Sequence, residues 1–341
     1  MAKTIFEKKN ILVAGGAGFI GSHLCDELVR NNKVICVDNF LTGLERNIDH
    51  LLRHPDFVFI KHDIVEPLDL DRVPELAKFK TEFQGVQEIY FAASPDSPKE
   101  YLKHPVETLL INSLGLKNML DLAVKYKAKF MYLSSSAIYG QAPAIPAGKK
   151  FFFKENYQGS VNTLEPHSSY IEGKRFGETL SANYRDKYEL DVKIVRLFDI
   201  YGPRMKFLDG RIIPEMVSLA LDNKEVVVEG DGNSLGSFCY VSDLVKGLQK
   251  VMDSQEAGPI NLGSNWDLKL ADLARQIVEL TGSSSKIKLA DPKIVSAVLP
   301  PKLPDIDLVK DRLGWFPVVL LVDGLKKIID DLRASKGLIN L

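Results

Sequence analysis

The stretch that most constrains the fold is an apolar run that leads into a glycine-rich turn and then a helical pattern. Residues 11–14 read Ile-Leu-Val-Ala, which is typical of a strand buried in a parallel sheet. Gly15, Gly18 and Gly21 follow with the spacing G-x-x-G-x-x-G, and residues 22–30 have a helical pattern. Small residues let the backbone turn tightly and approach a pyrophosphate, which the N-terminus of the next helix stabilises. This order of elements predicts a dinucleotide-binding unit.

A second predicted strand, residues 34–37, ends in an acidic residue, Asp38. The carboxylate lies about 20 residues beyond the glycines, where an adenosine ribose presents its hydroxyls. An acid at this position favours NAD, because it would repel a 2′-phosphate. A third predicted strand, residues 57–61, is followed by Asp63, which could reach an adenine amino group. A glycine turn without a ligand is the alternative, and the concordant strand, helix and acid argue against it.

Strand and helix patterns continue to alternate as far as residue 198, which predicts an α/β fold with a Rossmann-type doubly wound parallel sheet. Beyond residue 198 the alternation weakens, and short strand patterns mix with helices. We therefore expect an NAD-binding Rossmann domain over residues 1–198 and a smaller, mainly substrate-binding α/β lobe over residues 199–341, with the chain free to cross between them. The further predicted strands are 86–91, 130–133, 192–198, 226–228 and 259–261, and the helices are 105–126, 168–187, 243–252, 269–280 and 320–332.

Composition excludes several classes of function. The chain has 44 basic and 45 acidic residues, so its charge gives no case for binding nucleic acid or a membrane surface. Its three cysteines, Cys25, Cys36 and Cys239, are too widely spaced for a disulfide framework or a zinc site, and we expect no metal. No apolar run approaches the ~18 residues of a membrane span, and the charged N-terminus lacks a signal-peptide core. We expect a reduced, soluble, cytoplasmic protein.

Two polar motifs suggest chemistry. Tyr170 and Lys174 lie one helical turn apart on the same face, and an ammonium beside a phenol would lower the tyrosine pKa towards neutral and make it a base. By itself this spacing is common, and two residues on a solvated helix face are then the better explanation. Ser134, Ser135 and Ser136 follow a predicted strand, so they should face the crevice at the carboxyl edge of the sheet. A polar turn is the alternative there. Residues 141–163 are expected to form a loop.

Taken together, these motifs resemble the extended short-chain dehydrogenase/reductase superfamily, and within it the NAD-dependent sugar-nucleotide epimerases and dehydratases. The resemblance covers nearly the whole chain and is closest to the UDP-glucuronate decarboxylase branch. The matching stretches are 93–98 with Tyr101, His104-Pro105, Asn112, Gly115, 159–162, 170–175, 201–205, 209–211, 240–245, 304–306 and 313–315.

The resemblance implies a role for each polar motif. Tyr170 would take the proton of a sugar C4 hydroxyl while the C4 hydride passes to the nicotinamide, Lys174 would hold the phenolate and the nicotinamide ribose, and Ser135 would bind the reacting oxygen. The implied cofactor residues are Gly15, Gly18, Phe19, Ile20, Gly21, Asp38, Asn39, Asp63, Ile64, Ala92, Ala93, Ser94, Asn112 and Lys174. The implied substrate residues are Pro95, Ser136, Ala137, Asp199, Arg204, Arg211, Tyr240 and Lys302.

Four positions depart from this pattern. Ala137 stands where the decarboxylases and 4,6-dehydratases have a glutamate that assists chemistry after oxidation, and Gly236 stands where they have an arginine for the diphosphate. Asp199 replaces an asparagine, and Lys302 replaces an arginine, which keeps the charge but not the two-pronged fork. Arg204 and Arg211 remain as anion-binding candidates, with surface salt bridges as the alternative.

These four departures concern substrate binding and the chemistry that follows oxidation, not the binding of the cofactor. The expected activity is therefore oxidation of the C4 hydroxyl of a nucleoside-diphosphate sugar, as a 4-dehydrogenase or as the first half of a 4-epimerisation. The alternative is a UDP-glucuronate decarboxylase in which another acid covers for Ala137. An alternative of another class is a non-catalytic NAD(H)-binding regulator, against which the intact Ser135, Tyr170 and Lys174 argue.

The resemblance also implies a tightly bound NAD and a homodimer through a four-helix interface built from residues 105–126 and 168–187, with no nucleic acid or membrane partner.

Overall fold

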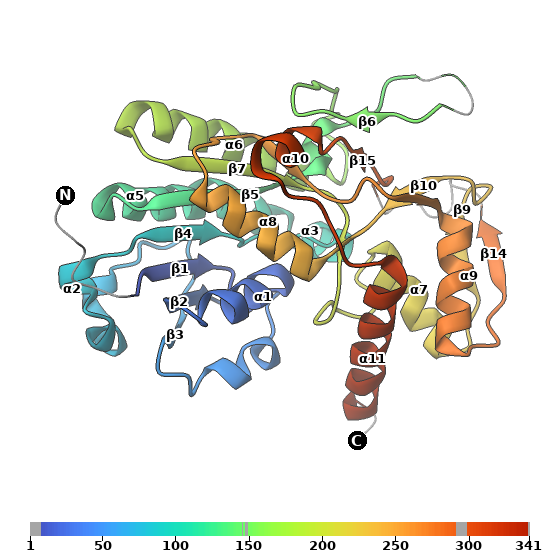
Figure 1. Ribbon diagram of the computed structural model, residues 1–341, viewed down its shortest axis with the longest axis horizontal. Coiled ribbons are helices and arrows are strands. Elements are labelled where there is room, and N and C mark those ends of the chain that lie inside the picture. The colour runs from blue at the N-terminus through green and yellow to red at the C-terminus, as the bar shows by residue number, and fades with distance from the viewer. Residues whose placement is uncertain (1–7, 145, 147–148, 291–298, 340–341) are drawn as a thin grey trace.

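A seven-stranded, fully parallel sheet forms the centre of the chain (Figure 1). The computed structural model describes residues 8–144, 146, 149–290 and 299–339. In spatial order the strands are β12 (Ile260–Leu262), β7 (Val192–Leu197), β5 (Lys129–Ser135), β4 (Glu88–Phe91), β1 (Asn10–Ala14), β2 (Lys33–Asp38) and β3 (Phe57–Lys61). The order reverses between β1 and β4, and a crevice at the carboxyl edge is expected at such a point.

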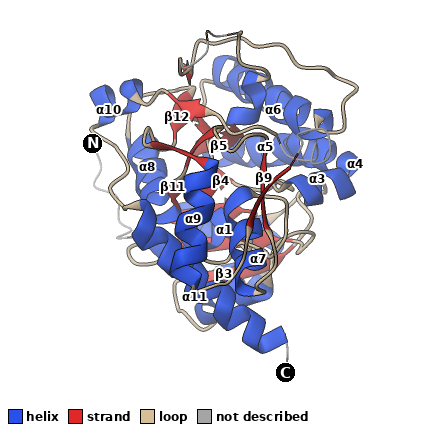
Figure 2. Cartoon of the chain, turned by 90° about the vertical axis from the view of Figure 1, so that its right-hand side faces the viewer, coloured by secondary structure: helices blue, strands red, loops and turns tan. Residues whose placement is uncertain are grey.

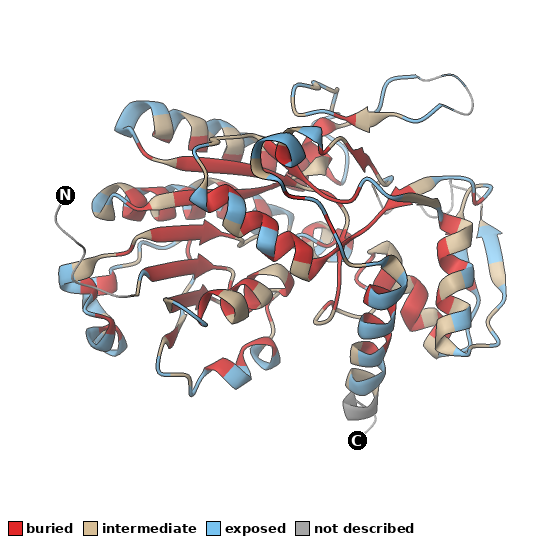
Figure 3. Cartoon of the chain, viewed as in Figure 1, coloured by how far each residue is buried: buried red, intermediate tan, exposed pale blue. Residues whose placement is uncertain are grey.

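The apolar strands are explained by layers of helices on both faces of the sheet. Ile11 and Val13 of β1 pack into one core cluster, and the alternate residues Leu12 and Ala14 pack into another. Both sets are buried, as the strands in Figure 3 show. Strands covered on both sides read as continuous apolar runs, which is why the sequence identified them.

Helices α1 (Phe19–Leu28) and α8 (Val241–Asp253) cover one face of the sheet. The other face is covered by α5 (Leu116–Tyr126) and α6 (Ser168–Tyr188), with α4 (Pro105–Leu110) packed against α6. The helix predicted over residues 105–126 contains one π-helical turn, Ile111–Gly115. Such turns redirect a side chain within a helix, and here Asn112 is the buried polar residue that the turn carries.

The C-terminal lobe contains α7 (Ile212–Leu221), α9 (Leu270–Thr281) and α11 (Leu321–Ile339), which Figure 2 shows grouped together. Its core is continuous with the cluster beneath α1 and α8. The small pairings there are β9 (Val226–Glu229) with β14 (Ile287–Ala290), β10 (Leu235–Ser237) with β13 (Asp267–Lys269), and β8 (Ile200–Tyr201) with β11 (Cys239–Tyr240).

The chain crosses between its two halves more than once. β12 returns to the main sheet, and β6 (Phe152–Phe153), inside the predicted loop, pairs with β15 (Leu303–Pro304). The domain boundary after residue 198 therefore stays a prediction. The remaining helices are α2 (Thr81–Gln84), α3 (Pro98–Lys103) and α10 (Asp307–Leu313). Within the described residues, no helix is long and apolar enough to cross a membrane.

Candidate active site

Three neighbouring pockets lie at the carboxyl edge of the sheet. The Asp38 pocket is lined by Gly15, Asp38 and Asp63, and the Arg204 pocket by Gly15, Gly21 and Arg204. The Tyr170 pocket is lined by Ser135, Ala137, Tyr170, Lys174, Asp199, Arg211 and Lys302. Ala92 and Ser94 line all three pockets, so the pocket of the tyrosine adjoins those of the dinucleotide turn.

The glycine turn has a shape that side chains would destroy. Gly15 has φ +79°, and a Cβ there would lie 2.6 Å from Cα of Ala93. A Cβ on Gly21 would lie 2.1 Å from the carbonyl oxygen of Gly15. The turn therefore packs directly on the first turn of α1 and on the end of β4. This cradle fits the pyrophosphate of a dinucleotide, which needs close approach to the backbone.

Asp38 ends β2 with its carboxylate held in place. Its Oδ2 accepts a hydrogen bond from the Ala17 N–H at 3.0 Å and its Oδ1 one from the Phe40 N–H at 2.8 Å. Burial raises the pKa of Asp38, and these backbone bonds oppose the rise. The carboxylate thus faces the Asp38 pocket at the position predicted for a ribose. The other predicted cofactor residues that line this pocket are Gly18, Asn39, Asp63, Ile64, Ala92, Ala93 and Ser94, and it also contains Pro95, which was predicted as a substrate residue.

Tyr170 projects from the first turn of α6 and is held by a second tyrosine. The rings of Tyr170 and Tyr101 stack with centroids 4.8 Å apart and an interplanar angle of 11°. The hydroxyl of Tyr101 hydrogen-bonds Nδ1 of His167 at 3.0 Å. Tyr101 was part of the family resemblance, but its function as the platform for Tyr170 was not predicted. The stacking of Tyr101 on Tyr170 depends on how α3 packs against the start of α6, and local sequence patterns do not predict the packing of two helices.

The expectation that Lys174 lowers the pKa of Tyr170 towards neutral is wrong for this structure. Burial and the nearby Asp96 carboxylate raise the pKa of Tyr170 above its usual value, and the Ser135 hydroxyl and Arg211 oppose the rise only in part. Lys174 directs its ammonium to the carbonyl oxygen of Leu133 at 2.8 Å, and burial lowers the pKa of Lys174 to about 8. Desolvation is thus the largest cause of both pKa shifts.

Ser135 ends β5 beside the tyrosine. Its Oγ accepts a hydrogen bond from the Ala137 N–H at 3.1 Å, which leaves the hydroxyl hydrogen available to donate into the pocket. Asn112 forms a separate set of hydrogen bonds: its Nδ2 donates to Ser94 Oγ at 3.0 Å and its Oδ1 accepts from the Tyr132 hydroxyl at 2.9 Å. Asn112 thereby holds Ser94, which lines the Tyr170 pocket.

The far wall of the Tyr170 pocket is charged. Arg211 is paired with Asp209 at 2.7 Å and with Asp96 at 3.6 Å, so its charge is already compensated. Burial raises the pKa of Asp199 to about 6, opposed by Lys302 and Arg211. Ser136 and Ala137 lie in the same pocket, so five of the eight predicted substrate residues meet here.

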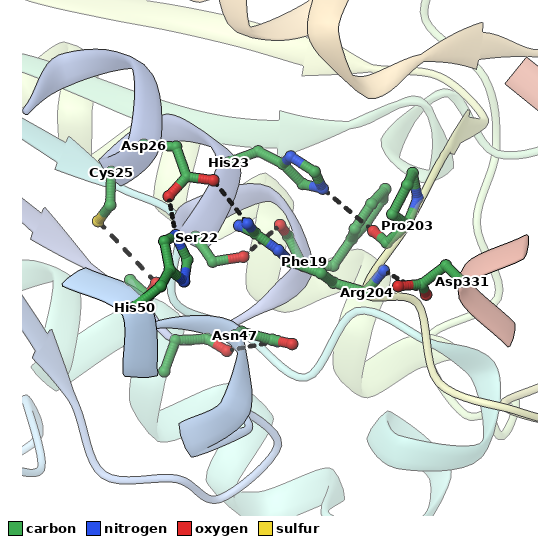
Figure 4. Close-up of polar contacts among 12 residues, drawn as sticks. Phe19, Ser22, His23, Cys25, Asp26, Asn47, His50, Pro203, Arg204 and Asp331 are labelled. Atoms are coloured by element: carbon green, nitrogen blue, oxygen red, sulfur yellow. Dashed lines mark hydrogen bonds and ion pairs between the residues drawn. The ribbon is translucent and has the colours of Figure 1, made fainter. Parts of the chain in front are cut away.

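Arg204 and Tyr240 lie outside the Tyr170 pocket. Figure 4 shows Arg204 directed at α1, with Nη2 2.6 Å from Oδ2 of Asp26, while its backbone N–H donates to Asp331 at 3.0 Å. Arg204 thus ties α1 to α11 beside the glycine turn, and a contact with substrate stays a prediction. Tyr240 packs edge-on against Tyr201, with centroids 5.5 Å apart.

Among the described residues, no three His, Cys, Asp or Glu side chains converge as a metal site requires.

Comparisons with known proteins agree with this geometry. The model of the NAD dependent epimerase/dehydratase family matches residues 11–263. UDP-glucuronic acid decarboxylase 6 of Arabidopsis thaliana is 38% identical over 334 residues, which are 96% of this chain and 90% of the relative. UDP-glucuronic acid decarboxylase 1 of Xenopus tropicalis is 38% identical over 333 residues, 96% of this chain and 73% of the relative.

A solved structure supports the same assignment. UDP-glucuronic acid 4-epimerase of Bacillus cereus, in complex with NAD, has a TM-score of 0.78 and 26% identity, and the match covers 96% of this chain and 99% of that one. The predicted fold and the predicted NAD dependence are therefore confirmed. The names of the sequence relatives favour the decarboxylase alternative over the C4 oxidation or epimerisation preferred from the sequence.

Proposed function

This chain belongs to the NAD-dependent epimerase/dehydratase family, and we propose that it oxidises the C4 hydroxyl of a nucleoside-diphosphate sugar bound in the Tyr170 pocket. The observation that carries the proposal is the convergence of Ser135, Tyr170 and Lys174 in one pocket that opens onto the glycine turn. A binding module would need the turn and Asp38 but not these three side chains, which argues against the regulator alternative.

NAD⁺, when bound, supplies the hydride acceptor and a positive charge that favours a phenolate. The chain aligns the reacting groups and moves the proton. Ser135 donates its free hydroxyl hydrogen to the C4 oxygen, and Tyr170 accepts the hydroxyl proton as the C4 hydride leaves. Tyr101 keeps the phenol in place by stacking, and Lys174 is held at the end of β5 by Leu133.

Decarboxylation is the second candidate, and the names of the sequence relatives favour it. It would share the C4 oxidation, since a ketone at C4 makes a sugar carboxylate a β-keto acid that loses carbon dioxide readily. Ala137 cannot exchange a proton in the step that follows, and Asp96 and Asp199 are the acids that line the pocket and could replace the missing glutamate.

We also propose that the chain forms a homodimer. Five large apolar side chains on neighbouring helical segments are exposed: Val106, Leu109, Leu110, Leu114 and Phe176. They lie on α4, the π turn and α6, the helices expected to form a four-helix interface, and a second copy of this face would cover them.

A panel of UDP-, GDP-, dTDP- and CDP-sugars tests the proposed reaction. Each is incubated with the enzyme and NAD, the absorbance of the reduced cofactor is followed, and products are identified by NMR. A 4-keto sugar or a C4 epimer supports the proposal. Release of carbon dioxide with a pentose product would establish the second candidate, and binding of NAD without any turnover would favour the regulator.

A further inference from the structure

We infer that Asp199 determines substrate specificity: it accepts a sugar nucleotide whose sugar is uncharged and rejects one whose sugar carries a carboxylate. The inference rests on the proposed function because it assigns the sugar class for the same pocket. It concerns binding, however, so it can be tested without hydride transfer.

The backbone places Asp199 at the carboxyl edge of the sheet. It stands two residues after the end of β7, and the residues around it are tied down on both sides. The Phe198 N–H donates to the Leu262 carbonyl at 3.0 Å, and the Asp199 carbonyl accepts from the Cys239 N–H at 2.9 Å. The side chain consequently lines the Tyr170 pocket from a rigid part of the fold.

The Asp199 carboxylate has no hydrogen-bond donor or ion-pair partner within the part of the chain that the structure describes. A carboxylate in a partly buried pocket needs donors, because leaving it unsatisfied costs the desolvation of a charged group. Its pKa of about 6 keeps it ionised at neutral pH. Sugar hydroxyl and amino groups supply the hydrogen bonds that it lacks.

Lys302 lines the same pocket as Asp199 and is attracted to it, but the two side chains form no direct salt bridge. The lysine is buried, with Nζ 6.0 Å from the ring centroid of Phe153. Burial lowers the pKa of Lys302, and the attraction of Asp199 opposes that change. Asp199 thus already supplies the negative charge that a substrate carboxylate would otherwise place near Lys302.

The other cations of the pocket do not offer a uronate an alternative. Arg211 is paired with Asp209 and Asp96, and Lys174 donates a hydrogen bond to the carbonyl of Leu133. A sugar carboxylate near Asp199 would therefore meet a like charge and would compete with Asp199 for the attraction of Lys302. The relatives named for glucuronic acid would differ from this chain in the sugar that they accept.

The test compares UDP-glucose with UDP-glucuronate, which differ only at C6, by calorimetric binding to the NAD-loaded full-length protein. We expect the wild type to bind UDP-glucose about tenfold or more tightly than UDP-glucuronate. Asp199→Asn should shift this ratio about tenfold or more towards the uronate, since the like charge is removed and Lys302 then attracts the sugar carboxylate without competition. The double variant Asp199→Asn/Lys302→Met should lose that gain, which separates charge compensation from a change of shape.

Asp311→Asn, the same substitution at an exposed position of α10, is the matched control and should leave the ratio unchanged. Circular dichroism and NAD binding verify that each variant folds. The inference is overturned if the wild type binds the uronate as well as the neutral sugar, if it binds neither, or if Asp199→Asn shifts the ratio less than tenfold. Failure of the proposed C4 oxidation would show instead as binding of the neutral sugar without reduced cofactor.

Discussion

Burial governs the ionisable side chains of the cleft. Tyr170 and Asp199 have raised pKa values and Lys174 a lowered one, and desolvation is the largest cause in each case. The spacing of Tyr170 and Lys174 correctly placed both in one pocket. It could not reveal their pKa values, because those depend on Asp96 and on the depth of the cavity, which come from distant parts of the chain.

The pKa of Asp199 makes the sugar preference dependent on pH. Below about pH 6 the carboxylate gains a proton, so its repulsion of a uronate disappears as the pH falls. Discrimination between UDP-glucose and UDP-glucuronate should thus be smaller at about pH 5 than at about pH 7. Lys174, with a pKa of about 8, stays protonated throughout this range. The charged or titratable groups that interact electrostatically with Asp199 are Lys302, Arg211 and Tyr170, and Asp96, Tyr101 and Lys174 line the same pocket.

Binding measured at both pH values in wild type and in Asp199→Asn checks this prediction. The variant should show less change with pH because its amide does not titrate. Equal pH dependence in the two proteins would assign the effect to another group.

At the scale of elements, the glycine turn shows what a sequence can predict. The spacing of the glycines indicates a turn whose conformation depends only on residues next to one another in the sequence. Gly15, Gly18 and Gly21 accordingly lie where they were expected. The π turn in the predicted helix 105–126 and the support of Tyr170 by Tyr101 were missed, because both arise from packing between elements.

Gly21→Ala should abolish tight NAD binding and lower stability. The added Cβ would lie 2.1 Å from the Gly15 carbonyl oxygen, which is rigid backbone, so α1 must move away from the turn. Titration with NAD and thermal unfolding measure the two effects. Gly282→Ala meets no atom within 4 Å, so it should retain NAD binding, although the φ of +66° at this position strains an alanine and should lower stability. Normal NAD affinity in Gly21→Ala would contradict the assignment of the turn.

The helix that carries Tyr170 is fastened to β7 by an ion pair. Glu178 of α6 accepts two hydrogen bonds from Arg196, at 2.9 Å from Nε and 2.7 Å from Nη2, and both side chains are largely buried. Glu178→Ala leaves a buried guanidinium without its carboxylate and should lower the free energy of unfolding by about 3 kcal/mol. Urea unfolding measures this loss.

An exposed ion pair provides the comparison. Asp272→Ala breaks the contact of Asp272 with Arg275 on α9, which lies at the surface, and should change the free energy of unfolding by less than about 1 kcal/mol. Equal losses in the two variants would mean that the α6–β7 pair contributes no more than a surface contact.

At the scale of the whole molecule, alternation of strands and helices predicted the parallel sheet and its helical layers. The contacts that join the two halves were not predictable, because β6 pairs with β15 and Arg204 with Asp26 between segments far apart in the sequence. The cleft depends on these contacts, since residues from both halves line the Tyr170 pocket.

The exposed apolar face on α4 and α6 predicts a dimer with about twice the 38.1 kDa mass of one chain. Phe176→Glu should yield a monomer, because it places a charge at the centre of the proposed interface. Light scattering at micromolar protein measures the mass. Phe83→Glu changes an exposed phenylalanine of α2, outside that face, and should leave the dimer intact. A monomeric wild type would contradict the prediction.

The most direct test of the central claim follows the hydrogen at C4. A sugar nucleotide accepted by the pocket is labelled with deuterium at C4 and mixed with the NAD-loaded enzyme in a single turnover. The proposed function predicts that deuterium appears on the reduced nicotinamide, and that Tyr170→Phe slows its transfer by about 10²–10⁴-fold while the sugar nucleotide still binds. Turnover without deuterium on the cofactor, or an unchanged rate in Tyr170→Phe, would contradict C4 oxidation with Tyr170 as the base.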